Sequence, residues 1–158
     1  MSPEARCELQ ETSGLAFRKV ARILGIDHGS KRIGLAISDP DGKVALPVGT
    51  LTRQGLERDL AAIRELVEAR QVERIVVGLP LHMDGRSGRE AEAARAFAER
   101  LASELGLPVD TIDERWTTRE AERALRATGR KGKKKRAVID SVAAALFLRT
   151  YLEREGAD

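Results

Sequence analysis

The chain of 158 residues has few of the side chains that form cross-links or nitrogen- and sulfur-rich metal sites. It contains one cysteine, Cys7, and two histidines, His28 and His82. A single cysteine excludes an internal disulfide framework and a cysteine-rich zinc site, and two histidines disfavour a histidine-rich metal centre. Any bound metal would therefore be held mainly by carboxylates, which favours hard cations such as Mg²⁺ or Mn²⁺.

Aromatic residues and long apolar runs are also scarce. Aromatic residues make up 3% of the chain and charged residues 34%, so we expect an aliphatic core. No apolar run approaches the roughly 18 residues that a membrane-spanning helix requires. The N-terminal segment lacks the apolar stretch of a secretory signal. These features predict a soluble, cytoplasmic protein that makes no use of a membrane, and the length favours a single domain.

The N-terminal segment differs in composition from the rest of the chain. Residues 1–20 show no hydrophobic periodicity and few large apolar side chains, which predicts a flexible arm. Apolar patterning begins abruptly after it. We therefore expect one ordered domain over residues 21–154 and a short C-terminal tail at 155–158.

Positive charge is concentrated in one short segment. The formal net charge is +3, and it would be −3 without six basic residues that fall within seven positions: Arg130, Lys131, Lys133, Lys134, Lys135 and Arg136. A local basic patch on a mildly acidic body suits a polyanionic partner such as nucleic acid. The alternative is a solvated charge run that keeps the protein soluble.

Three short apolar segments open the predicted domain. The patterns predict strands at residues 23–26, 33–37 and 44–51, joined by tight turns. Pro47 interrupts the third segment and places it at a sheet edge, because proline cannot donate a ladder hydrogen bond. The three segments therefore predict an antiparallel meander.

Helical and extended patterns then alternate. Capping boxes are expected at Ser87 with Glu90 and at Thr117 with Glu120. The expected elements are a helix at 55–71, a buried strand at 75–77, a helix from the first box to about residue 105, a strand at 109–112, a helix at about 117–127, and a last helix ending near 153. This order predicts an α/β fold with a mixed sheet and helices packed on it.

Three carboxylates stand out against their surroundings. Asp27 ends the first strand, and Glu114 follows the strand at 109–112, with Asp110 and Asp113 beside it. Asp140 lies in a helix that is apolar nearly all round, where an unpaired carboxylate would be costly to bury. Asp27, Glu114 and Asp140 would converge if the two strands were neighbours and the helix covered them. Three such oxygen ligands suit two Mg²⁺ or Mn²⁺ ions, which activate water and stabilise the leaving oxygen of a phosphodiester.

Each carboxylate also has a simpler explanation. Asp27 is explained equally by a turn-capping role, which is common at strand ends. Glu114 is explained by an ion pair in solvent with Arg115 or Arg119. Asp140 is explained by a salt bridge to the basic segment. The residues alone leave these alternatives open.

Four motifs favour the catalytic interpretation. The segments RILGIDHGSKRIGLAISDP (22–40), GLPLHMDGRSG (78–88), DERWTT (113–118) and AVIDSVAAALFL (137–148) follow one another in order. Together they resemble the YqgF family, whose members are described as Holliday junction resolvases or pre-16S rRNA nucleases. The match runs from about Arg22 to about Leu152. The resemblance implies an RNase H-like fold with the β-meander first.

The resemblance also implies roles for particular residues. Asp27, Glu114 and Asp140 match the family's metal-binding catalytic trio. By the same resemblance, phosphate contacts are implied for Lys31, Arg32 and Arg115. The basic segment leads directly into the helix bearing Asp140, and this position favours a phosphate-binding role for it too. The sequence departs from the family pattern at His28, where an aromatic residue is common. A ligand or proton-shuttle role is open to this histidine, but a structural or solvent-facing role is the favoured interpretation.

The expected function is a metal-dependent nuclease, and we favour 5′-end processing of pre-16S rRNA, with the small ribosomal subunit as a partner. One alternative is a resolvase of four-way DNA, which would be a homodimer, whereas an rRNA-processing enzyme works as a monomer. Another alternative is a non-catalytic RNA- or ribosome-binding module. The Asp27-x-Gly29 pattern also resembles the first phosphate motif of actin-like ATPases and sugar kinases, but those need two such domains.

Overall fold

The computed structural model of the chain describes residues 22–80, 84–113 and 133–156, and only the backbone of residues 133–139. The expected arm at 1–20 and the expected helix at 117–127 lie outside these residues. No helix in the described ranges has the length and apolar character needed to cross a membrane.

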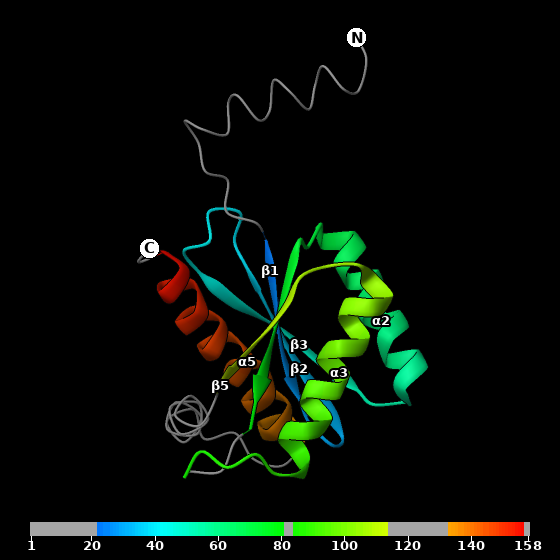
Figure 1. Cartoon of the computed structure of the whole chain (residues 1–158). Helices are drawn as coiled ribbons and strands as arrows, with labels where there is room; N and C mark the ends of the chain where they lie inside the picture. The colour runs from blue at the N-terminus through cyan, green and yellow to red at the C-terminus, as the bar shows by residue number, and fades with distance from the viewer. Residues whose placement is uncertain (1–21, 81–83, 114–132, 157–158) are drawn as a thin grey trace.

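A five-stranded sheet forms the centre of the fold, in the order β3-β2-β1-β4-β5 (Figure 1). The strands are β1 (Ile23–His28), β2 (Arg32–Ser38), β3 (Ala45–Thr52), β4 (Arg74–Leu79) and β5 (Val109–Asp113). The first three form an antiparallel meander, and β1, β4 and β5 run parallel. The predicted mixed sheet is confirmed, and Pro47 lies in the edge strand β3, as expected of a proline within a sheet.

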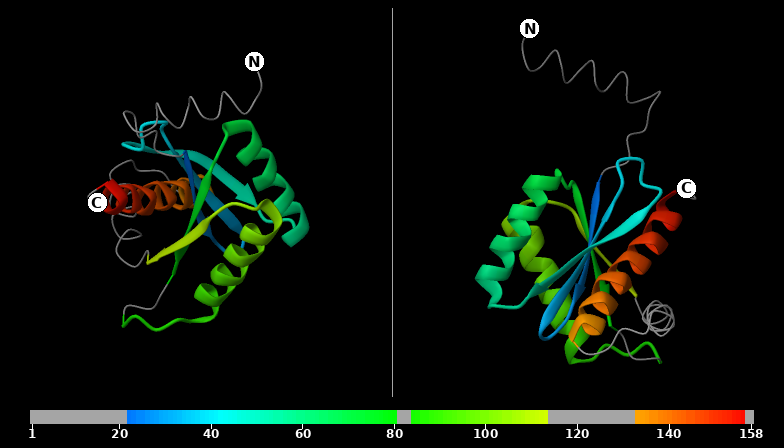
Figure 2. Two further views of the ribbon diagram at one scale, coloured as in Figure 1. Left: turned by 45° about the horizontal axis from the view of Figure 1, so that its top comes forward. Right: turned by 180° about the vertical axis from the view of Figure 1, so that it is seen from behind.

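Helices cover both faces of the sheet (Figure 2). Helices α2 (Leu56–Arg70) and α3 (Arg89–Leu105) pack on one face, and α5 (Lys133–Gly156) packs on the other. The crossovers through α2 and α3 are long enough to return the chain for parallel pairing, as parallel strands require.

The start of α3 corrects one sequence-based expectation. Ser87 does not cap the helix: Gly88 is the N-cap residue, and it makes no side-chain capping bond. The Ser87 hydroxyl instead accepts a hydrogen bond of 2.7 Å from Nη1 of Arg95. The capping box failed because its hydroxyl bonds to a side chain eight residues further along the chain.

Alternation along β1 divides the core into two parts. Leu24 and Ile26 belong to the larger cluster, which also contains Leu60 and Phe97 from α2 and α3. Ile23 belongs to the second cluster, against α5. Because successive strand residues face opposite sides, residue 27 faces α5 and residue 28 faces α2 and α3.

Two strand glycines let α5 lie very close to the sheet. A Cβ atom at Gly25 would lie 3.2 Å from the Ala144 carbonyl oxygen, and one at Gly34 only 2.1 Å from the Asp140 carbonyl oxygen. Any side chain at Gly34 would therefore displace the helix backbone. The glycines bring the part of α5 around Asp140 directly onto β2.

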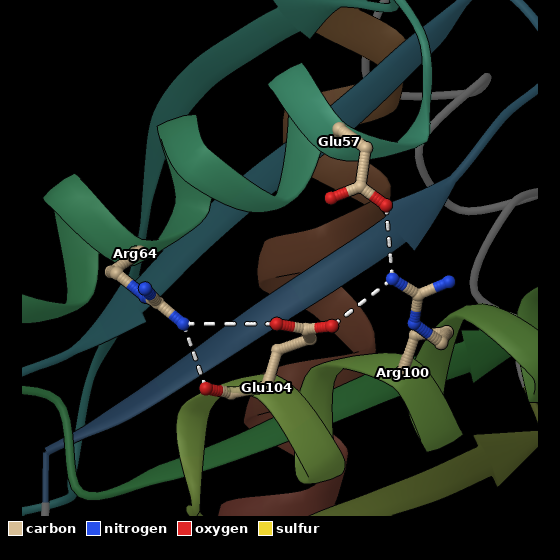
Figure 3. Close-up of polar contacts among 4 residues, drawn as sticks. All are labelled: Glu57, Arg64, Arg100 and Glu104. Carbon is tan, nitrogen blue, oxygen red and sulfur yellow. Dashed lines mark hydrogen bonds and ion pairs between the residues drawn. The ribbon is translucent and has the colours of Figure 1, made fainter.

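On the opposite side of the sheet, exposed ion pairs join α2 to α3 (Figure 3). Nη2 of Arg100 lies 3.0 Å from Oε1 of Glu57 and 3.1 Å from Oε1 of Glu104. Nη2 of Arg64 donates a bond of 2.7 Å to the Glu104 carbonyl oxygen. Exposed pairs of this kind contribute about 0–1 kcal/mol each.

Candidate functional site at the carboxyl end of β1

Asp27 lies near the end of the central strand. It pairs with Gly34 of the antiparallel neighbour β2 and with Gly78 of the parallel neighbour β4. Directly paired residues share a face of the sheet, so no strand side chain stands beside Asp27 at these two positions. The half-buried carboxylate thus lies on the face that α5 covers, between two glycines.

Asp140 approaches the same place from α5. A Cβ atom at Gly34 would lie 3.0 Å from the Asp140 Cβ atom. Gly34 is therefore both the strand partner of Asp27 and the point where the helix rests on the sheet. The structure thus places both residues next to Gly34, although they are more than a hundred residues apart in the sequence.

An arginine from β2 pairs with Asp140. Nε of Arg32 donates a hydrogen bond of 3.0 Å to Oδ2 of Asp140, and the two side chains are 23% and 26% exposed. Burial raises the pKa of the Asp140 carboxyl above its usual value, and the Arg32 guanidinium opposes that rise. Asp140 thus has the cationic partner that its apolar helix requires, and β2 supplies it.

A cavity of about 310 Å³ lies beside this pair. It is lined by Gly29, Ser30, Lys31, Arg32 and Asp140. The turn at residues 29–31 borders this cavity. It requires glycine at position 29, because a Cβ atom there would lie 2.4 Å from the Arg32 carbonyl oxygen. Two cationic side chains and one carboxylate at one cavity form a site that can receive a phosphate group and a hard cation together.

The remaining predicted site residues lie outside the described part. Glu114, Arg115, Arg130 and Lys131 are not described, and for the other four residues of the basic segment (Lys133, Lys134, Lys135 and Arg136) only the backbone is, as the start of α5. Asp113, the residue before Glu114, pairs with Leu79 at the edge where β1 also ends.

The donor set at this edge fits a hard cation only in part. Asp27 and Asp140 contribute the carboxylate oxygens that Mg²⁺ and Mn²⁺ prefer. Within the described residues, no group of three histidine, cysteine, aspartate or glutamate side chains is placed to hold a metal ion. The predicted third ligand, Glu114, is not among those residues.

His28 has the structural role that the sequence favoured. Its ring is 9% exposed and lies 4.7 Å from the Phe97 ring, centroid to centroid, on the face opposite Asp27. Burial, and after it the nearby Arg53 charge, lowers the pKa of His28 to about 4. A neutral imidazole packed against α3 points away from the face on which Asp27 and Asp140 lie.

Asp110 also lies away from this site. Its Oδ2 atom accepts hydrogen bonds from Nη1 of Arg74 at 3.1 Å and from the Tyr151 hydroxyl at 2.5 Å. It lies near the beginning of β5, whereas Asp27 is near the end of the parallel β1. Asp110 and Asp113 of β5 therefore lie toward opposite ends of the sheet.

Sequence reasoning missed Arg53 and Asp59. The Asp59 side chain is 1% exposed and lies 3.3 Å from Nε of Arg53. Arg53 in turn bonds to the backbone on both sides of Ser30. A carboxylate in the first turn of a helix is ordinarily exposed, so local sequence had no signal for its burial.

The sequence matches the family model described as "RuvX: Holliday junction resolvase" over residues 21–154. A relative from Moorella thermoacetica is 50% identical over 135 residues, covering 85% of this chain and 96% of the relative. A relative from Koribacter versatilis is 45% identical, covering 87% and 90%. Both relatives carry the name "Putative pre-16S rRNA nuclease".

Two solved structures share the fold at low sequence identity. RuvC from T. thermophilus, in complex with a Holliday junction substrate, has a TM-score of 0.57 at 18% identity, covering 87% of this chain and 97% of that one. The fowlpox virus resolvase, with Holliday junction DNA, has a TM-score of 0.50 at 10% identity, covering 85% and 98%. These likenesses support the RNase H-like architecture.

Proposed function

Because the chain belongs to the RuvX (YqgF) family of nucleases, we propose that it is a metal-dependent nuclease that processes the 5′ end of pre-16S rRNA. One observation carries the proposal. Asp27 and Asp140 both adjoin Gly34, and Asp140 lines a cavity together with Lys31 and Arg32. Carboxylates next to cations are the arrangement that brings a hard metal ion and a phosphodiester together.

The carboxylates would hold the ions. Asp27, Asp140 and Glu114 would hold two Mg²⁺ or Mn²⁺ ions. When bound, the ions would supply an activated water and stabilise the leaving oxygen. The two glycines that flank Asp27 keep its carboxylate accessible from the sheet on both sides.

Arg32 would pair first with Asp140 and then with a substrate phosphate. In the structure its guanidinium pairs with Asp140, which offsets the cost of burying that carboxylate. A metal ion on Asp140 would replace this positive charge. Arg32 would then be available for a substrate phosphate, because it lines the adjoining cavity.

The basic segment would bind the RNA backbone. Lys31 is exposed at the cavity, and α5 begins within the segment, at Lys133. Arg115 would add a phosphate contact next to Glu114. Each lysine or arginine that neutralises a phosphate releases a counterion, so RNA affinity would fall steeply with salt concentration.

Cleavage of four-way DNA is the second candidate function. The family description and the fold likeness to RuvC favour it. A resolvase must cut two strands symmetrically, so this function would require a homodimer, whereas rRNA processing suits a monomer at the small ribosomal subunit. The names of the curated relatives, which are 45% and 50% identical, favour the RNA substrate.

A cleavage assay tests the proposal. Wild type, Asp27→Asn and the control Asp110→Asn are each given a pre-16S rRNA fragment and a four-way DNA junction, with Mg²⁺ or Mn²⁺. We expect wild type and Asp110→Asn to cleave the rRNA fragment and Asp27→Asn to bind it without cleavage. Activity retained in Asp27→Asn would refute the site assignment, and cleavage of the junction alone would favour the DNA function. No cleavage with retained binding would favour a non-catalytic binding module.

A further inference from the structure

Arg53 holds the turn that follows Asp27. Its backbone N–H donates a hydrogen bond of 3.0 Å to the Lys31 carbonyl oxygen. Its Nη1 atom donates a second bond of 3.3 Å to the Gly29 carbonyl oxygen. The two acceptors lie on either side of Ser30, so one residue fixes both sides of the turn.

Asp59 orients the Arg53 side chain. Oδ2 of Asp59 lies 3.3 Å from Nε of Arg53, and Oδ1 accepts a bond of 3.0 Å from the Gln54 backbone N–H. Asp59 lies in the first turn of α2, where a negative charge is favoured by the helix dipole. A carboxylate that is 1% exposed requires a cationic partner, and Arg53 supplies it.

The turn is therefore tied to helices on both faces of the sheet. On one side, Asp59 of α2 holds Arg53, and Arg53 holds the carbonyls of Gly29 and Lys31. On the other side, Arg32 at the end of the turn pairs with Asp140 of α5. The cavity residues Lys31 and Arg32 lie between these two attachments.

We propose that Arg53, oriented by Asp59, is a positioning residue that fixes the Gly29–Lys31 turn and so places Lys31 and Arg32 for the substrate phosphate. This inference rests on the proposed nuclease function for the identity of the ligand. It concerns the geometry of the phosphate-binding side of the site, whereas the carboxylates provide the chemistry. Arg53 acts through its bonds to the turn backbone and to Asp59.

The guanidinium geometry carries this role, because its nitrogens bond to Gly29 and Asp59 at the same time. A lysine has one nitrogen and makes such paired, directional bonds poorly, although it keeps the positive charge. A second cavity, of about 260 Å³, borders Arg53, His28, Phe97 and Arg100. Space next to the side chain allows lysine to be introduced without overpacking.

Arg53→Lys is the main test variant, and Arg100→Lys is its matched control. Arg100 borders the same second cavity, but its ion pairs connect α2 and α3 and do not reach the turn (Figure 3). Asp59→Asn is a second variant that keeps Arg53 but removes the charge that orients it. Each variant is compared with wild type by amide hydrogen exchange and by steady-state cleavage of the pre-16S rRNA fragment.

In Arg53→Lys, we expect amide exchange at residues 29–32 to accelerate about tenfold or more, the effect of losing one charge-assisted hydrogen bond. Exchange in β4 should stay at the wild-type rate. KM for the rRNA fragment should rise by about tenfold for the same reason, while kcat stays within about threefold. Asp59→Asn should change exchange and KM in the same direction, and Arg100→Lys should change neither.

Three outcomes would overturn the inference. Unchanged exchange at residues 29–32 would show that Arg53 does not hold the turn. Acceleration of equal size in β4 would show a general loss of stability. Local acceleration without a change in KM would show that the turn does not place the phosphate contacts. If wild type neither binds nor cleaves the rRNA fragment, the proposed function fails, and exchange still decides whether Arg53 holds the turn.

Discussion

Two ionic clusters lie under α5, at opposite ends of the sheet, and they differ in how completely their polar groups are bonded. At one end, Arg32 and Asp140 are joined by a hydrogen bond of 3.0 Å and line a cavity. At the other end, Arg74, Asp110 and Tyr151 each bond to the other two, at 2.5–3.1 Å. An arginine–aspartate pair under a helix is therefore not by itself a sign of function.

The source of the carboxylate also differs. Asp140 belongs to the helix, so its position depends on the close contact between α5 and Gly34. Asp110 and Arg74 both belong to the sheet, and the helix contributes the Tyr151 hydroxyl. The first cluster borders a cavity, whereas the second joins the far end of α5 to the sheet.

The largest expected difference between the clusters is in activity. Asp140→Asn should lower kcat/KM by more than about 100-fold. Removing a group that only hydrogen-bonds to a metal ligand costs up to about 100-fold, and Asp140 is itself a proposed ligand. Asp110→Asn makes the same chemical change in the other cluster and should leave kcat/KM within about twofold of wild type, because Asp110 lies at the opposite end of the sheet from Asp27. Cleavage assays on the rRNA fragment measure both. Equal losses in the two variants would remove the functional distinction between the clusters.

The next largest difference is in stability, at the two glycines under α5. Gly34→Ala should lower the free energy of unfolding by about 3 kcal/mol, because a methyl group would overlap the Asp140 backbone. Gly25→Ala places its methyl group 3.1 Å from the Leu148 Cβ atom and 3.2 Å from the Ala144 carbonyl oxygen, and it should cost about 1 kcal/mol, since a shift of a few tenths of an ångström relieves both contacts. Urea unfolding measures both values. A smaller loss in Gly34→Ala than in Gly25→Ala would contradict the close contact at Asp140.

Tyr151→Phe should have a smaller effect, confined to stability. The substitution removes the hydroxyl that bonds to Asp110 and Arg74, at an expected cost of about 1 kcal/mol. Activity should not change, because the carboxylates of the candidate site are unaffected. Urea unfolding and the cleavage assay are again the measurements. A fall in kcat/KM without a fall in stability would assign the second cluster a part in the reaction.

The smallest effect is a pH dependence at the same tyrosine. Burial, and then the hydrogen bond to Asp110, raises the pKa of the Tyr151 hydroxyl above its usual value. In the unfolded chain the hydroxyl ionises near pH 10, before it ionises in the folded protein. The stability that Tyr151 contributes is therefore fully present below about pH 10 and is lost as the pH rises through the higher folded-state value. The stability difference between wild type and Tyr151→Phe should be constant from pH 7 to 9 and should shrink above pH 10; a constant difference up to pH 11 would contradict the shift.

Much of the fold was predictable from local patterns. Local patterns depend on residues within a few positions of one another. Such patterns are the apolar runs at β1, β2 and β4 and the helical spacing in α2 and α3. Asp27 and Asp140 were recognisable because one ends a buried strand and the other interrupts an apolar helix. The capping role of Ser87 failed, because a hydroxyl near a helix start has several possible partners and Arg95 was one of them.

The sequence by itself determined the family and the order of the described elements, and it singled out Asp27 and Asp140, since these follow from motifs and short-range periodicity. Only the tertiary structure decided which groups meet. It paired Asp140 with Arg32, put His28 on the face opposite Asp27, and buried Asp59 beside Arg53. The physical reason is that these contacts depend on strand register and on how closely a helix approaches the sheet. Both are set jointly by segments far apart in the chain.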